Sequence, residues 1–149
     1  MSAMAYQRLR VGSTQVWPTG GSVFDALVKE FGPFDLDACA TRENAKAERF
    51  NDADVWVSGL AVPWIGLVYM NPPYSGRVIG KWVAKAYQSS LEGATVVCLL
   101  PVRTDTAWWH DYVMQAAEIR FLRGRGHFTN AAGERSAEPF ASAIVVFRL

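Results

Sequence analysis

One short apolar segment constrains the fold of this chain more than any other feature. Residues 94–100 read Ala-Thr-Val-Val-Cys-Leu-Leu and contain no charged side chain. A continuous run of small, aliphatic and β-branched residues is typical of a strand that is covered on both faces. Such strands occur mainly in parallel sheets with helices on their faces, so the segment predicts an α/β protein.

Helical and strand patterns alternate along the rest of the chain. Apolar side chains recur at helical spacing over residues 23–31 and 79–91, and Gly32 and Gly93 stand where such helices end. A further helix is predicted over residues 107–117. Strands are predicted at residues 34–40, 67–70, 118–122 and 140–149. This alternation predicts a mainly parallel sheet.

Length and composition indicate a single domain. The chain has 149 residues, of which 50% are hydrophobic, and its formal net charge is +1. We expect a weakly structured lead-in over residues 1–16 and one domain over residues 17–149. The balanced charge gives no sign of a uniformly basic nucleic-acid binder, so any DNA-binding surface must be local.

Absent sequence signals narrow the class of protein further. Cys39 and Cys98 lack the spacing of a zinc site or of a paired redox motif, so no metal is expected. The N-terminus lacks a signal-peptide pattern, and no segment approaches the length of about 18 apolar residues that spans a membrane. The sequence therefore predicts a cytoplasmic protein with no membrane partner.

A rigid polar turn follows the strand predicted at residues 67–70. It reads Asn71-Pro72-Pro73-Tyr74, and its prolines have a fixed φ and no N–H that could compete for the carbonyl oxygens. The Asn71 side-chain oxygen and the Pro72 carbonyl oxygen can both accept hydrogen bonds from a planar amine. Two such acceptors draw the nitrogen toward tetrahedral geometry and free its lone pair for methyl transfer, while Tyr74 can stack on the base.

Several amines fit this turn equally well. Four candidates are planar and weakly nucleophilic, namely the exocyclic amines N6 of adenine, N4 of cytosine and N2 of guanine, and the side-chain amide of glutamine. The motif therefore predicts a planar-nitrogen methyltransferase more firmly than it predicts adenine as the substrate. The structural alternative is a strand that simply ends in a Pro-Pro turn.

Three polar clusters follow predicted strands, at residues 37–40, 71–74 and 101–106. In an open parallel sheet, ligands bind outside the carboxyl ends of the strands. The shared position of the three clusters therefore supports a functional site at that edge of the sheet.

Taken together in this order, the motifs resemble those of the phage-encoded DNA N6-adenine methyltransferases of the Dam type. The resemblance covers about residues 17–147. It rests on Trp17, on the segments at residues 34–40, 43–46 and 49–50, on Met70-Asn71-Pro72-Pro73-Tyr74-Ser75, and on the segments at residues 99–101, 103–106, 108–110 and 119–125.

The resemblance implies a small Rossmann-like methyltransferase fold, with a mainly parallel sheet and an antiparallel C-terminal strand. It implies S-adenosyl-L-methionine as the cofactor and double-stranded DNA as the partner, with the target adenine flipped out of the stack. The implied catalytic residues are Asn71, Pro72, Pro73 and Tyr74. The implied cofactor-binding residues are Trp17, Thr19, Asp37, Ala38, Cys39, Ala40, Asp54 and Asn71. The implied DNA-binding residues are Ser75, Arg103, Thr104, Asp105, Arg123 and Arg125.

The chain departs from the family pattern in two places. It reads Pro18-Thr19 where the family usually has Thr-Pro, and no Gly-x-Gly loop follows the first predicted strand. The small residues at 38–40 take the place of that loop and let the backbone approach the methionine part of the cofactor. Only about 30 residues separate Asp37 from Asn71, too few for two full βα units, so we expect a trimmed sheet with a loop-rich middle.

A basic, glycine-containing stretch lies between the last two predicted strands. With the end of the strand before it, this stretch covers residues 119–129, which contain Arg120, Arg123, Arg125 and His127 but no acidic residue. Such a stretch suits phosphate contacts or, alternatively, a solvated charged loop or hairpin.

The predicted function is S-adenosylmethionine-dependent methylation of adenine N6 in DNA. Two alternatives stay open, namely another planar-nitrogen methyltransferase and a catalytically silent nucleic-acid-binding relative.

Overall fold

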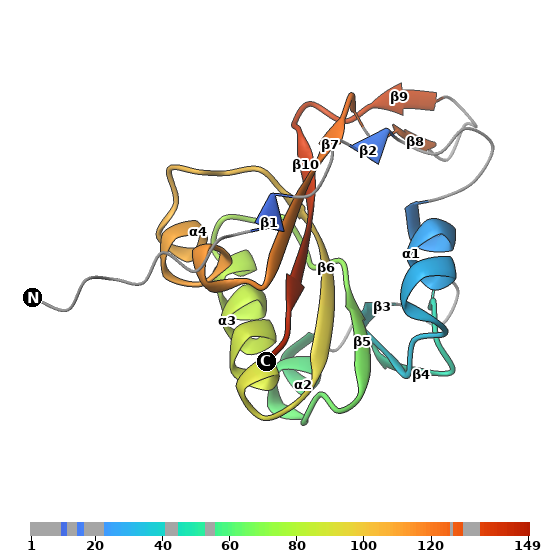
Figure 1. Ribbon diagram of the computed structural model, residues 1–149, viewed down its shortest axis with the longest axis vertical. Helices are drawn as coiled ribbons and strands as arrows, with labels where there is room; N and C mark the ends of the chain where they lie inside the picture. The colour runs from blue at the N-terminus through green and yellow to red at the C-terminus, as the bar shows by residue number, and fades with distance from the viewer. Residues whose placement is uncertain are drawn as a thin grey trace, which may run out of the picture.

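A mixed sheet of mostly parallel strands forms the centre of the molecule (Figure 1). The computed structural model describes residues 10–11, 15–16, 23–40, 45–52, 56–125, 127–129 and 135–149. The strands are β1 (Arg10–Val11), β2 (Gln15–Val16), β3 (Leu36–Ala40), β4 (Arg49–Asp52), β5 (Leu67–Met70), β6 (Thr95–Pro101), β7 (Glu118–Arg123), β8 (His127–Thr129), β9 (Arg135–Ala137) and β10 (Ser142–Phe147). The helices are α1 (Val23–Phe31), α2 (Trp56–Ala61), α3 (Ile79–Leu91) and α4 (Ala107–Asp111), and a 3-10 turn covers Val113–Gln115.

The strand order confirms the predicted α/β fold class. The sheet runs β1-β7-β10-β6-β5-β3-β4, and β2 also pairs with β7. The pairs β3–β4, β3–β5 and β5–β6 are parallel, whereas β10 is antiparallel to both β6 and β7. The sheet is therefore mainly parallel with an antiparallel C-terminal strand. The short strands β8 and β9 form a separate antiparallel hairpin. The connection between β7 and β10 therefore contains a hairpin, one of the two forms that the sequence allowed for it.

Helices cover both faces of the sheet (Figure 1). The helix α3 turns Ile79, Trp82, Val83 and Ala86 into the core with α2 and α4 on the same face, and α1 packs against the other face. A spacing of three and four residues places these apolar side chains on one stripe, which explains why periodicity located α3 correctly. None of the helices described is long and apolar enough to cross a membrane.

Two contacts at the start of β3 fix its register with β5. The Asp35 N–H donates to the Leu67 carbonyl oxygen at 2.8 Å, and the Asp35 carboxylate accepts from the Leu67 N–H at 2.8 Å. Gly66, with φ +82°, allows this approach, because a Cβ there would lie 2.4 Å from Asp35 Oδ2. Leu36 therefore pairs with Val68, and both strands end at the same edge.

The middle of the chain is more ordered than the sequence predicted. The loop-rich region expected between β3 and β5 contains the strand β4, parallel to β3, and the short helix α2. Only residues 41–48 join β3 to β4, fewer than the dozen or more residues of an ordinary crossover that includes a helix.

The helix predicted over residues 107–117 is shorter than expected. The α-helix ends at Asp111, and Tyr112 adopts φ −121° and ψ −52° before the 3-10 turn. Val113, in the 3-10 turn, and Ala116, just after it, are both buried in the core. The local pattern predicted a continuous helix because it contains no information about this tertiary packing.

A buried ionic cluster joins α1 to β7. The Arg120 guanidinium donates to both carboxylate oxygens of Glu30 on α1 and, at 2.6 Å, to Glu118 on its own strand. It also lies 5.5 Å from the centre of the Phe31 ring. Arg120 is only 7% exposed, so the expectation that it contacts phosphate is wrong. Side chains alternate along β7, which turns Arg120 toward α1 and leaves Arg123 exposed.

Replacing Arg120 by Ala should destabilise the fold, because it leaves the half-buried Glu118 carboxylate without its partner and releases α1. We expect a loss of about 3 kcal/mol in urea unfolding at neutral pH. The Arg120 side chain holds the pKa of Glu30 below its ordinary value of 4.5, so this contribution is present above pH 4.5 and declines as pH falls through the lower native pKa. Arg123→Ala, an exposed change on the same strand, is the matched control and should shift stability by less than about 0.5 kcal/mol.

Candidate active site

The Asn-Pro-Pro-Tyr turn lies at the carboxyl end of β5, as the sequence predicted. Asn71 is exposed, Pro72 is buried, and Pro73 is exposed. The Tyr74 hydroxyl donates to Asn71 Oδ1 at 2.8 Å and lies 3.3 Å from the Leu99 carbonyl oxygen on β6. The turn therefore presents the Asn71 carboxamide to solvent, with its oxygen already held on one side.

Arg103, on the loop after β6, supports this turn from the neighbouring strand. Its guanidinium donates to the Tyr74 carbonyl oxygen at 2.7 Å. The Thr106 hydroxyl donates to the Arg103 carbonyl oxygen at 2.7 Å, and Thr106 also caps α4 by accepting from the Trp109 N–H. The polar clusters at residues 71–74 and 101–106 are thus in direct contact, which agrees with the shared edge of the sheet that the sequence predicted for them.

Tyr74 cannot act as a base in this environment. Burial raises the pKa of its phenol, with a further increase from the nearby Glu138 carboxylate and a smaller opposing effect of Arg103. The shift is upward from an ordinary value of 10.0, so the hydroxyl stays protonated and acts as a hydrogen-bond donor at neutral pH.

Asp37 has a buried carboxylate and, although the sequence predicted it at the end of a strand, it is the second residue of β3, where it pairs with Tyr69 on β5. It is 2% exposed and accepts from the N–H groups of Lys46 at 2.9 Å and Cys39 at 3.4 Å. Burial raises its pKa to about 6, although the two N–H groups oppose the shift. The carboxylate organises the backbone that leaves β3, and its poorly compensated charge would favour a cationic group nearby.

The small residues after Asp37 are closely packed. Ala38 and Ala40 are buried, and Cys39 is half-buried. Burial raises the pKa of Cys39 to about 11, so its thiol stays protonated and is a poor nucleophile. Since β3 pairs with β4 on one side and β5 on the other, the chain reverses direction across the sheet here, and such a switch point is where open α/β sheets bind ligands.

The expected DNA-binding residues also lie at this edge. Ala143 on β10 pairs with both Leu100 and Phe121, so β6 and β7 end at the same level. The exposed residues of this set are Ser75, Thr104, Asp105, Arg123 and Arg125. Three expected cofactor residues, Trp17, Thr19 and Asp54, lie outside the described residues.

Sequence reasoning missed two groups that contact the Asn-Pro-Pro-Tyr turn. Phe140, just before β10, packs edge-on against Tyr74, with ring centres 5.3 Å apart and planes at 76°. The Leu99 carbonyl oxygen is the second acceptor near the Tyr74 hydroxyl. Neither has a sequence signal, because a lone aromatic residue and a strand carbonyl are ordinary features of any α/β chain.

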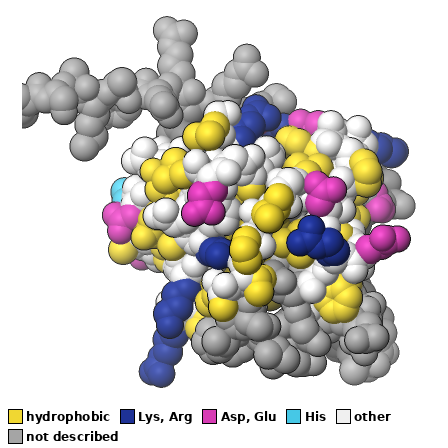
Figure 2. Space-filling view, turned by 90° about the horizontal axis from the view of Figure 1, so that it is seen from below, with side chains coloured by type: hydrophobic (Ala, Val, Ile, Leu, Met, Phe, Trp, Pro, Cys, Tyr) yellow, Lys and Arg dark blue, Asp and Glu magenta, His cyan; other side chains and the backbone are white. Residues whose placement is uncertain are grey.

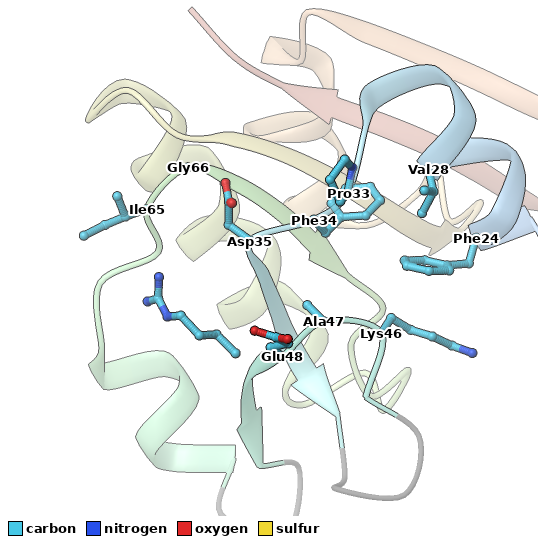
Figure 3. A pocket seen from close by; sticks show the side chains of 11 residues that line it. Phe24, Val28, Pro33, Phe34, Asp35, Lys46, Ala47, Glu48, Ile65 and Gly66 are labelled. Atoms are coloured by element: carbon cyan, nitrogen blue, oxygen red, sulfur yellow. The ribbon is translucent and has the colours of Figure 1, made fainter.

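A hollow of about 720 Å³ lies beside the amino ends of β3 and β5, away from the Asn-Pro-Pro-Tyr turn (Figure 3). Its apolar lining comes from α1 and the start of β3, and its charged residues include Asp35, Lys46, Glu48 and Arg49. It lies beside the short connection between β3 and β4, where an ordinary crossover helix would cover the sheet. Asp35 and Gly66 in its lining directly precede β3 and β5, so the hollow borders the amino ends of these strands, whereas ligands of open α/β sheets bind at the carboxyl ends.

Figure 2 shows the molecule from this lower side. Acidic and basic side chains are interspersed there among apolar ones, over the part of the surface that is described. Such a mixture produces no extended field of one sign, which makes this face a poor match for the DNA backbone.

The topology and the amide-bearing turn together define a Rossmann-like methyltransferase fold. Comparison with known proteins narrows the class: residues 7–149 match the family model for DNA N-6-adenine-methyltransferase (Dam). The chain therefore belongs to the Dam family of DNA N6-adenine methyltransferases, which confirms the resemblance seen in its sequence.

Two phage proteins are among its relatives, both called DNA N-6-adenine-methyltransferase. The protein of Escherichia phage T1 is 34% identical over 110 residues, covering 72% of this chain and 44% of the relative. The protein of Haemophilus phage HP1 (strain HP1c1) is 34% identical over 122 residues, covering 80% of this chain and 68% of the relative. The match thus spans less than half of the T1 protein. No solved structure matches the chain significantly.

The raised pKa of Asp37 predicts an unusual pH dependence of stability. Between its ordinary value of 3.8 and its native value of about 6, the native state binds more protons than the unfolded state. Its contribution to stability therefore falls as pH rises through this window. Relative to the Asp37→Asn variant, the wild type should lose about 3 kcal/mol across the window, measured by urea unfolding at several pH values. A stability difference between the two proteins that does not change with pH would contradict the assignment.

Proposed function

We propose that this protein transfers a methyl group from S-adenosyl-L-methionine to the N6 amine of adenine in double-stranded DNA. The single observation that carries the proposal is the exposed Asn71 carboxamide at the carboxyl end of β5, with its oxygen held by Tyr74. Membership of the Dam family supports adenine among the planar amines that the turn could bind. The names of the two phage relatives support the same activity.

The reaction needs a more nucleophilic amine than free adenine offers. The lone pair of N6 is delocalised into the ring, and hydrogen bonds from N6 to Asn71 Oδ1 and the Pro72 carbonyl oxygen oppose this delocalisation. With S-adenosyl-L-methionine bound beside it, N6 would form a bond to the methyl carbon as the sulfur–methyl bond breaks. The cofactor would leave as the neutral thioether S-adenosylhomocysteine, and the positive charge would pass from sulfur to N6. That nitrogen is then strongly acidic and loses its proton to water, so no dedicated base is required. Tyr74, whose raised pKa keeps it protonated, takes no part in this proton transfer.

The residues at the switch point fit the cofactor that the family implies. S-adenosylmethionine carries a cationic amine and a sulfonium, and supplies an electrophilic methyl group when bound. The Asp37 carboxylate is buried without a side-chain hydrogen bond among the described residues, so a cationic ligand would stabilise its ionised form. Small side chains at positions 38–40 let a ligand approach the backbone closely. Trp17, Thr19 and Asp54 complete the proposed cofactor set.

The proposed DNA surface surrounds the catalytic turn. A base in duplex DNA cannot reach Asn71 while it is stacked, so the target adenine must be flipped out. Ser75, Thr104 and Asp105 lie exposed around the turn, where they can contact the nucleotides beside the flipped base. Arg123 and Arg125 lie exposed at the same edge and supply positive charge for phosphates.

Tritium transfer from labelled S-adenosylmethionine to separate DNA, RNA and protein fractions tests the proposed activity against its alternatives. Label in DNA, recovered as N6-methyladenine, is the expected result. Asn71→Ala should lower kcat by about 100-fold or more, because one of two preorganised acceptors is lost, while cofactor affinity changes little.

Gln88→Ala, which removes an exposed amide from α3, is the matched control and should keep the wild-type rate. Label in RNA or protein alone would show that the substrate is another planar nitrogen and not adenine N6 in DNA. A wild-type rate for Asn71→Ala would remove Asn71 from the mechanism.

Removing the positive charges of Arg123 and Arg125 tests the DNA surface. If each arginine neutralises a phosphate, the slope of log affinity against log salt should become shallower by about 1 per arginine, equally for all DNA sequences. Binding of the Arg123→Ala, Arg125→Ala double variant at several salt concentrations measures this slope. The Lys29→Ala, Arg49→Ala double variant removes the same charge from α1 and the lower edge, and should leave the slope unchanged. A loss confined to some sequences would indicate base contacts instead.

A further inference from the structure

The Tyr74 hydroxyl lies between two acceptors but carries one proton. Asn71 Oδ1 is 2.8 Å away and the Leu99 carbonyl oxygen is 3.3 Å away. The shorter distance makes Asn71 the main acceptor. An amide oxygen has two lone pairs, so Oδ1 can accept from Tyr74 and from a substrate amine at the same time.

Residues from neighbouring strands hold Tyr74 in this position. Arg103, after β6, donates to its carbonyl oxygen at 2.7 Å. Phe140, before β10, packs edge-on against its ring at 5.3 Å, a geometry that aromatic pairs favour. The turn after β5 is therefore fixed by residues that flank β6 and β10, the two strands next to β5 on one side of the sheet.

Asn71 itself is exposed and needs such support. Two orientations of a carboxamide differ only in the exchange of its oxygen and nitrogen, and only one of them presents an acceptor to an amine. A hydroxyl donor bonded to Oδ1 stabilises the orientation that does so. The raised pKa of Tyr74 keeps that donor protonated.

We propose that Tyr74 is a positioning residue, whose hydroxyl holds the Asn71 carboxamide with Oδ1 ready to accept the substrate amine, and that Phe140 and Arg103 hold Tyr74 in place. This inference rests on the proposed function of Asn71. It adds a role for the Tyr74 hydroxyl that is separate from stacking of its ring on a base.

Tyr74→Phe separates the two roles, because it keeps the ring and its contact with Phe140 but removes the hydroxyl. We expect kcat to fall roughly 3- to 10-fold, the effect of losing one neutral hydrogen bond, with KM for DNA and cofactor affinity unchanged. Tyr87→Phe is the control, since it removes a hydroxyl from α3, where the ring packs against Tyr112 and Phe147. An unchanged kcat for Tyr74→Phe, or a change in KM alone, would overturn the proposal.

The double variant tests whether Tyr74 acts through Asn71. In single-turnover assays, Tyr74→Phe should have little further effect on the residual rate once Asn71 is replaced by Ala. An equal fall in both backgrounds would show that the hydroxyl acts independently of Asn71, against the proposal. A wild-type rate for Asn71→Ala alone would overturn the proposed function itself, which keeps the two failures distinct.

Nuclear magnetic resonance of the Asn71 side-chain amide gives a readout that does not need activity. Its two N–H signals should shift or broaden in Tyr74→Phe, because the carboxamide is no longer held in one orientation. They should stay unchanged in Tyr87→Phe. Identical Asn71 signals in Tyr74→Phe and wild type would overturn the proposal whatever the kinetics.

Discussion

Parallel pairing of β5 with β3 on one side and β6 on the other is the constraint on which the rest of the structure depends. Parallel strands end at the same edge of a sheet, so this pairing places Asn71 two residues beyond Tyr69, the partner of Asp37 on β3, and on the side of the Leu99 carbonyl oxygen. Asp35 fixes the register through two hydrogen bonds to the backbone of Leu67. A slip of one residue would exchange the side chains of β5 between the two covered faces of the sheet and move Asn71 away from its partners.

The two shifted carboxylates have opposite energetic roles. Glu30 shares the Arg120 guanidinium, which lowers its pKa and makes its charge a source of stability. Asp37 is more deeply buried and receives hydrogen bonds from backbone N–H groups, so its pKa is raised and its charge is costly. The Glu30 carboxylate stabilises the contact between α1 and β7. The Asp37 carboxylate, whose ionisation is unfavourable, lies at the proposed cofactor site. Buried groups with a shifted pKa, such as Asp37, are common at functional sites, where a ligand can compensate the charge.

The turn after β5 illustrates how a short motif depends on its surroundings. Its prolines make the backbone rigid, but the orientation of the Asn71 side chain is set by Tyr74, and Tyr74 is held by contacts from the neighbouring strands. The chemical group is thus encoded locally, while its alignment comes from three adjacent strands. A motif in an unrelated chain would carry the same amide without this alignment, which is why the motif alone left several functions open.

The sequence by itself determined the elements whose signals are local. Periodicity located α1 and α3, the apolar run located β6, and the position of Asn71 after a strand placed it at the ligand-binding edge. Only the tertiary structure decided the strand order, the shortened α4, the formation of β4 and the partners of individual side chains. Arg120 stands in an acid-free stretch of sequence, yet it pairs with Glu30, 90 residues away. The physical reason is that hydrogen bonds and packing form between residues that are close in space, and separation along the chain leaves no periodic trace of such contacts.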